Sequence, residues 1–242
     1  MISNVEVILL AGGLGTRLRD QVPNLPKPMA PVAGRPFLEY VLDKLKEGGI
    51  SRVVLAVGYR AEAIISHFGS DYRGIELVYA HEIEPLGTGG AIAFALSFVK
   101  ASRALVLNGD TYLEMNYAAF VHACDANRAA LGIVVRLVPD TTRYGRCELK
   151  NNTVIRFSEK SEARPGLINA GVYYLSRDVF EQYGMPPNFS FERDFVGVHL
   201  AAILPFGFPV DGYFIDIGVP EDFRQAQQDF ASSRRHGPAG KS

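Results

Sequence analysis

Up to about Pro139, short apolar runs alternate with segments in which apolar side chains recur at helical spacing. Such runs suit strands that are buried on both faces, and the segments between them suit helices that cover the strands. Because a helix follows each strand, neighbouring strands can run in the same direction, so the pattern predicts a mostly parallel sheet with helices on both faces. We expect strands at 5–10, 52–57, 75–79, 104–107 and 131–137, and helices at 36–47, 88–100 and 116–128.

After about Pro139 polar and apolar residues alternate singly, which is typical of antiparallel strands. YGRCELKNNTVIRFSEK predicts a hairpin around Asn151 and Asn152, and FGFPVDGYFIDIG predicts a second hairpin with its turn near Asp211 and Gly212. LINAGVYYLS predicts a strand, FSFERDFVGVHLA a helix, and PEDFRQAQQDF a final helix with two acids at its positive end. We expect one domain over 1–231 and a disordered tail over 232–242, because the tail has no large apolar side chain to anchor it.

The charge of the chain is nearly balanced, with 25 Lys and Arg against 26 Asp and Glu among 242 residues. The charge pattern therefore indicates neither nucleic-acid binding nor membrane binding, and a small-molecule partner is expected. The apolar runs are shorter than the roughly 20 residues that cross a bilayer, which predicts a cytoplasmic protein. Cys124 and Cys147 are the only cysteines and the five histidines are scattered, so we expect buried thiols and no zinc site.

The segment VILLAGGLGTRLRD, Val7 to Asp20, places three glycines and two arginines directly after the first predicted strand. Ligands bind at this end of the strands in such sheets, and glycines let backbone N–H groups approach an anion. Leu18 stands where the dinucleotide fingerprint needs its third glycine, and no Gly-Lys-Ser or Gly-Lys-Thr follows as in a phosphate loop. Lys27, between two prolines, adds a second cation to Arg17, so we interpret the loop as half of a polyphosphate site.

The motifs LAGGLGTRL, PKPM, PVAGRP, PLGTGGA, NGD, FSEK, NAGVY and DIGVPEDF follow one another in the order found in sugar-1-phosphate nucleotidyltransferases. The chain resembles this family over about residues 5–230. Its short length and the segments FSFERDF and GYFIDIGVPEDF are most similar to the D-glycero-α-D-manno-heptose 1-phosphate guanylyltransferases. The resemblance implies a Rossmann-like three-layer α/β/α nucleotide-diphospho-sugar transferase fold with a mixed, mostly parallel central sheet. It also implies a nucleotide-binding part at about 1–138 and a small antiparallel sugar-phosphate-binding part at about 139–231.

The family's reaction joins a nucleoside triphosphate to a sugar 1-phosphate and releases pyrophosphate. The protein has to position two anions that repel each other and to stabilise the charge of the transition state. The resemblance assigns Arg17 and Lys27 to the triphosphate and Lys160 to the sugar phosphate. It assigns Asp110 and Asp216 to Mg²⁺, a cation that prefers few carboxylates together with phosphate oxygens.

The resemblance also implies contacts that are not catalytic. Those with the nucleotide are Leu10, Ala11, Gly12, Gly13, Gly15, Thr16, Glu82, Gly87, Thr88 and Gly109. Those with the sugar or its phosphate are Gly145, Glu159 and Asn169.

The segment HEIEPLGTGGA matches the part of the family that lines the base pocket. Guanine presents N–H donors at N1 and N2, and a carboxylate is an acceptor-only group that suits them. Glu82, or as a second choice Glu84, is therefore our hypothesis for reading guanine. This favours GTP, with a heptose 1-phosphate as the acceptor, for surface polysaccharide synthesis. The enzymatic alternative is a UTP- or dTTP-dependent hexose 1-phosphate nucleotidyltransferase.

Two alternatives come from other functional classes, a binding protein and an oxidoreductase. A non-catalytic sugar-nucleotide sensor on the same fold would be marked by loss of Arg17, Lys27, Asp110 or Asp216, and all four are present. A dinucleotide-binding oxidoreductase is disfavoured by Leu18. The sequence leaves the oligomeric state open, a homodimer included.

Overall fold

The first strand, β1 (Glu6–Leu10), lies inside the sheet and sends alternate side chains to its two faces. Val7 and Leu9 pack into one hydrophobic core and Ile8 into the other, which explains why the strand is apolar on both faces. The computed structural model describes residues 5–13, 18, 21–158 and 163–235, and for 233–235 it describes the helical backbone only.

Four parallel strands form the half of the sheet around β1. They pair in the order β7 (Arg103–Asn108), β1, β4 (Arg52–Val57) and β6 (Ile75–His81). The helices between them are α1 (Phe37–Glu47), α2 (Ala61–Phe68) and α3 (Gly87–Leu96). The predicted alternation of parallel strands and helices is confirmed for this half of the chain.

The other half of the sheet is a closed ring of strands rather than a separate antiparallel part. Strand β12 (Gly166–Ser176) pairs antiparallel with β7, so the second half continues the same sheet, ten strands in all among the described residues. The ring runs through β12, β9 (Leu131–Val138), β13 (Phe206–Val210), β11 (Thr153–Ser158) and β10 (Arg146–Lys150), and β10 pairs back to β12. The structure is thus mixed α/β, with its parallel strands mainly at one end.

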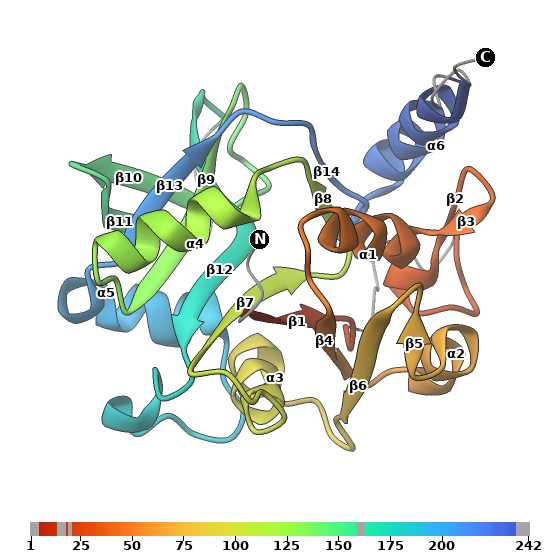
Figure 1. Cartoon of the computed structure of the whole chain (residues 1–242). Coiled ribbons are helices and arrows are strands. Elements are labelled where there is room, and N and C mark those ends of the chain that lie inside the picture. Colours follow the sequence, from red (N-terminus) through yellow and green to blue (C-terminus); the bar gives the residue numbers. More distant parts are fainter. Residues whose placement is uncertain (1–4, 14–17, 19–20, 159–162, 236–242) are drawn as a thin grey trace, which may run out of the picture.

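Helices cover both faces of this sheet (Figure 1). One core contains side chains of α1, α2, α4 (Tyr117–Ala126) and α6 (Pro220–Arg235). The core on the opposite face contains side chains of α3 and of η4 (Phe191–Gly197), a π-helical segment that leads into α5 (Val198–Ile203). The remaining short elements are η2 (Lys27–Met29), β2 (Pro31–Val32), β3 (Arg35–Pro36), β5 (Asp71–Tyr72), β8 (Thr111–Leu113), η3 (Glu181–Tyr183) and β14 (Phe214–Asp216).

The hairpin predicted around Asp211 and Gly212 is wrong. The chain leaves β13 there and crosses to another part of the molecule, where β14 pairs antiparallel with β8. β13 instead pairs with β9 and β11. Alternation predicts a strand but does not determine its partner, because two neighbouring strands can each find a better-packed partner elsewhere.

Three further predictions concern the tail, the membrane and the cysteines. Helix α6 runs to Arg235, so residues 232–235 of the expected tail are helical, and 236–242 lie outside the described residues. Among the described residues no helix is both long enough and apolar enough to span a bilayer. Cys124 and Cys147 are buried and unpaired with each other, as expected.

Candidate functional site

Lys27, Asp110 and Asp216, hereafter the charge cluster, meet although they are far apart in the sequence. The Lys27 Nζ lies 2.5 Å from Asp110 Oδ2 and 3.3 Å from Asp216 Oδ1. Pairing of β14 with β8 brings the two aspartates together, since Asp216 stands opposite Thr111, the residue that follows Asp110. The Ile217 N–H also donates to the Asp110 carbonyl at 3.0 Å. The contact that the incorrect hairpin prediction overlooked therefore assembles this site.

The cluster is more accessible at its carboxylates than at its ammonium. The side chain of Lys27 is 12% exposed, against 30% for Asp110 and 27% for Asp216. Burial by itself lowers the pKa of Lys27, but the charges of Asp110 and Asp216 outweigh it and raise that pKa, so Lys27 is a cation. Burial and the neighbouring Asp110 raise the pKa of Asp216, against the opposing effect of Lys27.

Gly218 contacts the charge cluster, although the sequence patterns did not single it out as a site residue. Its N–H donates to Asp216 Oδ1 at 2.7 Å. A Cβ at this position would lie 2.8 Å from both Asp216 Oδ1 and Lys27 Nζ, closer than real contacts. The glycine of the DIGVP segment therefore leaves the space that the ammonium and the carboxylate occupy.

The cluster fits the chemistry of a bound Mg²⁺. Two carboxylates converge there and remain partly exposed to solvent, so phosphate oxygens and water can complete the coordination of a hard cation. In the described part of the chain no group of three or more His, Cys, Asp or Glu side chains forms an all-protein metal site. A pair of carboxylates that leaves coordination positions open to phosphate oxygens is a donor set that suits Mg²⁺.

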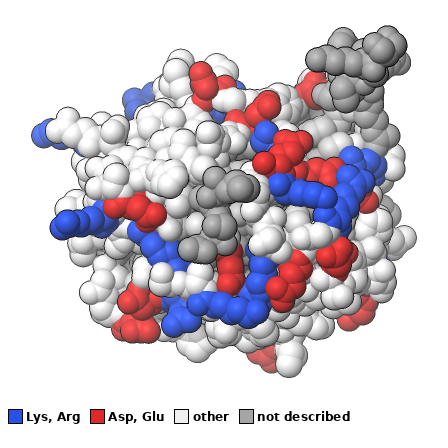
Figure 2. All heavy atoms as spheres, in the orientation of Figure 1, with Lys and Arg blue, Asp and Glu red and all other residues white. Residues whose placement is uncertain are grey.

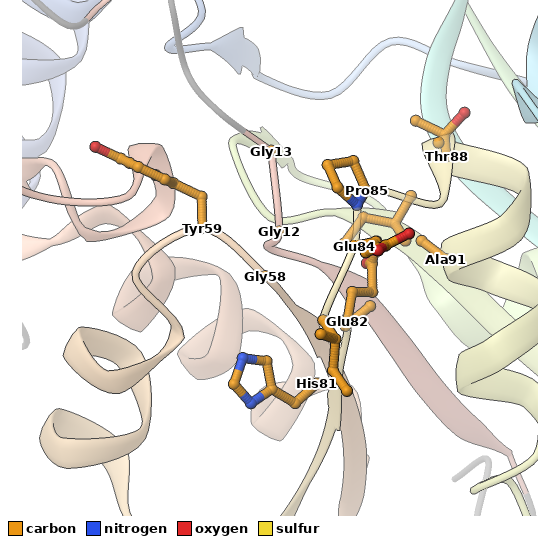
Figure 3. A pocket seen from close by; sticks show the side chains of 14 residues that line it. Gly12, Gly13, Gly58, Tyr59, His81, Glu82, Glu84, Pro85, Thr88 and Ala91 are labelled. Carbon is orange, nitrogen blue, oxygen red and sulfur yellow. The ribbon is translucent and has the colours of Figure 1, made fainter. Parts of the chain in front are cut away.

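A cavity of about 550 Å³ opens between the end of β1 and the start of α3, and we call it the β1–α3 cavity. Figure 3 shows the backbone of Gly12 and Gly13 on one side and Thr88 of α3 on the other. Of the residues predicted to contact a nucleotide, it is lined by Leu10, Gly12, Gly13, Glu82, Gly87 and Thr88. The remaining lining residues are Ala56, Gly58, Tyr59, His81, Ile83, Glu84, Pro85 and Ala91.

Two predicted nucleotide contacts, Ala11 and Gly109, do not line this cavity but donate hydrogen bonds to residues that do. The Ala11 N–H donates to the Ala56 carbonyl at 2.8 Å, and the Gly109 N–H donates to the Leu10 carbonyl at 2.9 Å. A Cβ on Gly109 would lie 2.9 Å from that same carbonyl oxygen. Gly109 therefore allows the ends of β1 and β7 to approach each other, a packing role that the motif alone did not reveal.

Glu82 is oriented by the backbone at the wall of the cavity. Its Oε2 accepts a hydrogen bond from the Leu86 N–H at 3.2 Å, just before α3 begins. Its Oε1 lies toward Gly12, where a Cβ would be 3.2 Å away. Burial raises the pKa of Glu82, while the Leu86 N–H opposes this effect by stabilising the carboxylate. Glu84 lines the same cavity.

The glycines at the start of α3 also have a packing function. Gly87 has φ +70°, and a Cβ there would lie 2.6 Å from the Phe189 carbonyl oxygen. A Cβ on Gly89 would lie 2.1 Å from the Phe189 ring. The Thr88 Oγ1 accepts from the Phe191 N–H at 2.9 Å. The PLGTGGA motif thus joins the cavity to the segment that leads into η4.

Asn169 and Gly145, the described members of the predicted sugar site, are adjacent. The Asn169 N–H donates to the Gly145 carbonyl at 2.8 Å. The Asn169 side-chain amide donates to the Tyr173 hydroxyl at 2.7 Å and to Glu192 Oε1 at 2.6 Å. Burial, and next the charge of Glu192, raise the pKa of Tyr173 well above its usual value, so this phenol stays neutral and donates to Glu192. Glu192 belongs to the FSFERDF segment, but no sequence rule singled it out.

Five predicted site residues lie outside the described residues. They are Gly15, Thr16, Arg17, Glu159 and Lys160.

Comparison with known proteins identifies the family of the chain. The family model described as nucleotidyl transferase matches residues 6–233. A D-glycero-alpha-D-manno-heptose 1-phosphate guanylyltransferase of Aneurinibacillus thermoaerophilus is 40% identical over 225 residues, which are 93% of this chain and 98% of that protein. The Campylobacter jejuni protein of the same name is 41% identical over 220 residues, 90% of this chain and 97% of its own.

A solved structure is similar over nearly the whole chain. The crystal structure of HddC from Yersinia pseudotuberculosis complexed with GMP-PN has a TM-score of 0.82 and 38% identity, and the match covers 93% of this chain and 99% of that one. On the motifs, the charge cluster and these matches, the chain belongs to the nucleotidyl transferase family and is a sugar-1-phosphate nucleotidyltransferase.

Proposed function

We propose that the chain transfers the guanylyl group of GTP to D-glycero-α-D-manno-heptose 1-phosphate and releases GDP-heptose and pyrophosphate. The observation that carries the choice of base is Glu82, an oriented carboxylate on the wall of a cavity large enough for a nucleotide. The names of the two relatives at about 40% identity, and the GMP-PN bound to the similar structure, support the same choice. The Rossmann-like half around β1 would hold the nucleotide, and the closed ring would hold the sugar phosphate.

The reaction needs no covalent enzyme intermediate. A phosphate oxygen of the sugar 1-phosphate forms a bond to the α-phosphorus, and the bond from that phosphorus to the oxygen bridging to the β-phosphate breaks, with pyrophosphate leaving. Lys27, together with Arg17 and Lys160, would stabilise the charge on the phosphates. Asp110 and Asp216 would hold Mg²⁺, which when bound neutralises phosphate oxygens.

Glu82 would read the base by accepting from guanine. Its carboxylate has two oxygens, and one of them already accepts from the Leu86 N–H, which limits how the side chain can rotate. The N1 and N2 donors of guanine suit an acceptor-only group, whereas uracil and thymine present a carbonyl beside their single ring N–H. An amide at this position would offer an NH2 donor group beside a carbonyl acceptor, and would therefore suit those pyrimidines better.

The test compares pyrophosphate release from GTP, UTP, dTTP, CTP and ATP with a panel of heptose and hexose 1-phosphates. We expect the wild type to prefer GTP and Glu82→Gln to lose about tenfold or more of that preference, the cost of one mismatched polar group. Glu84→Gln is the matched control on the same cavity wall and should keep the preference. An unchanged preference in Glu82→Gln would exclude Glu82 as the reader, and no turnover with any pair would favour the sensor.

The pH dependence gives a second readout for the same residue. Because burial raises the pKa of Glu82, its carboxylate is neutralised at a pH above the ordinary value for glutamate. The preference for GTP over UTP should therefore weaken as pH falls through that raised pKa. Glu82→Gln should lack this acid limb, and an identical limb in both proteins would contradict the assignment.

A further inference from the structure

Residues 139–145, which we call the β9–β10 loop, contact elements on both sides of the site. On one side, Arg143 Nη2 lies 2.7 Å from Asp222 Oδ2, and the Tyr144 ring packs edge-on against Phe214 with centroids 5.7 Å apart. On the other side, the Gly145 carbonyl accepts from the Asn169 N–H at 2.8 Å. The loop is therefore held between β12 and the β14–α6 segment that carries Asp216.

Asp222 connects α6 to this loop through its ion pair with Arg143. It lies in the first turn of α6, six residues after Asp216 in the chain. The hydrogen bond that Arg143 donates to the Asp222 carboxylate raises the pKa of Arg143, and the charge of Asp216 also contributes. Arg143 is thus a cation that is held by its ion pair with the first turn of α6.

The Arg143–Asp222 ion pair contributes more to geometry than to global stability. Its side chains are 36% and 24% exposed, and partly solvated pairs of this kind add little to the free energy of unfolding. A guanidinium nevertheless restricts how the two side chains are oriented, because its planar N–H donors match the geometry of a carboxylate. The pair is accordingly one of the contacts that hold the loop against the segment that carries Asp216, together with Tyr144 on Phe214.

We propose that Arg143 is a positioning residue for the sugar 1-phosphate, acting through Asp222. By holding the β9–β10 loop against α6, it sets the position of Gly145 relative to the charge cluster and to Asn169, which β12 holds in place. No residue of the loop lines the β1–α3 cavity, so the effect falls on the sugar phosphate and not on the nucleotide. This inference rests on the proposed function for the identity of the two substrates.

The kinetic test uses Arg143→Gln, Asp222→Asn, their double variant and Arg143→Lys, with the sugar 1-phosphate that the wild type uses best. Arg143→Gln and Asp222→Asn, which each remove one charge of the pair, should each raise KM for the sugar 1-phosphate about fivefold. KM for the nucleotide should stay unchanged. The double variant should be no worse than either single one, and Arg143→Lys should recover part of the loss. Arg224→Gln is the control, because its ion pair with Glu221 lies on the same helix in solvent.

Hydrogen exchange on the same proteins tests the contact without any substrate. Peptides covering the β9–β10 loop and the first turn of α6 should exchange faster in Arg143→Gln than in the wild type or in Arg224→Gln. The proposal is overturned if exchange is unchanged, or if both KM values rise together. A wild type that is inactive with GTP and heptose 1-phosphate would instead refute the proposed substrates and leave the exchange result to decide the role of Arg143.

Discussion

Replacing Lys27 with methionine should make the nucleotide-free protein bind a divalent cation more tightly. Two carboxylates and one ammonium give the charge cluster a formal charge of −1, and removing the ammonium leaves −2. One additional unit of negative charge attracts a divalent ion at roughly 4 Å by about 2 kcal/mol in a water-like environment. The carboxylates are only 27–30% exposed, so this value is a lower limit and the gain in affinity should be at least about 10- to 30-fold at low salt.

Mn²⁺ is the probe, because its free ion has an electron paramagnetic resonance signal that disappears on binding. Lys44→Met removes the same charge from a surface pair with Glu47 and should leave Mn²⁺ affinity unchanged. Adding Asp110→Asn to Lys27→Met should abolish the gain, which shows that the ion binds at this cluster. If Lys27→Met binds Mn²⁺ no more tightly than the wild type while its circular dichroism is native, the reasoning about the cluster is refuted.

Two predictions concern packing. Gly89→Ala should lower the free energy of unfolding, measured in urea, by about 1–3 kcal/mol, because its Cβ would lie 2.1 Å from the Phe189 ring. Gly13→Ala is the control: its Cβ would have no described atom within 4 Å, so the free energy of unfolding should stay unchanged. Burial raises the pKa of Cys124 and of Cys147 to about 12. Neither thiol should therefore react with Ellman's reagent at pH 8 until the protein is unfolded. Rapid labelling of the native protein would contradict their burial.

The sequence determined the elements whose side chains carry their own periodicity. The strands at 52–57 and 131–138 and the helix at 37–47 lie where the pattern predicted them, to within a residue. A buried parallel strand has to be apolar on both faces, and a covering helix has to repeat its apolar residues every three or four positions. The motifs also predicted that Lys27 and Asp110 belong to a charged site.

The tertiary structure alone decided which distant segments meet. Strands β14 and β8 are more than a hundred residues apart, and their pairing brings Asp216 to Asp110 and Lys27. The local alternation of polar and apolar residues does not specify which distant strand is the partner. The same holds for Glu192 beside Asn169 and Tyr173, and for Gly218, whose missing Cβ matters only because an ammonium and a carboxylate lie above it. Local spacing specifies which faces of an element are buried, whereas the identity of the neighbour follows from the packing of the whole chain.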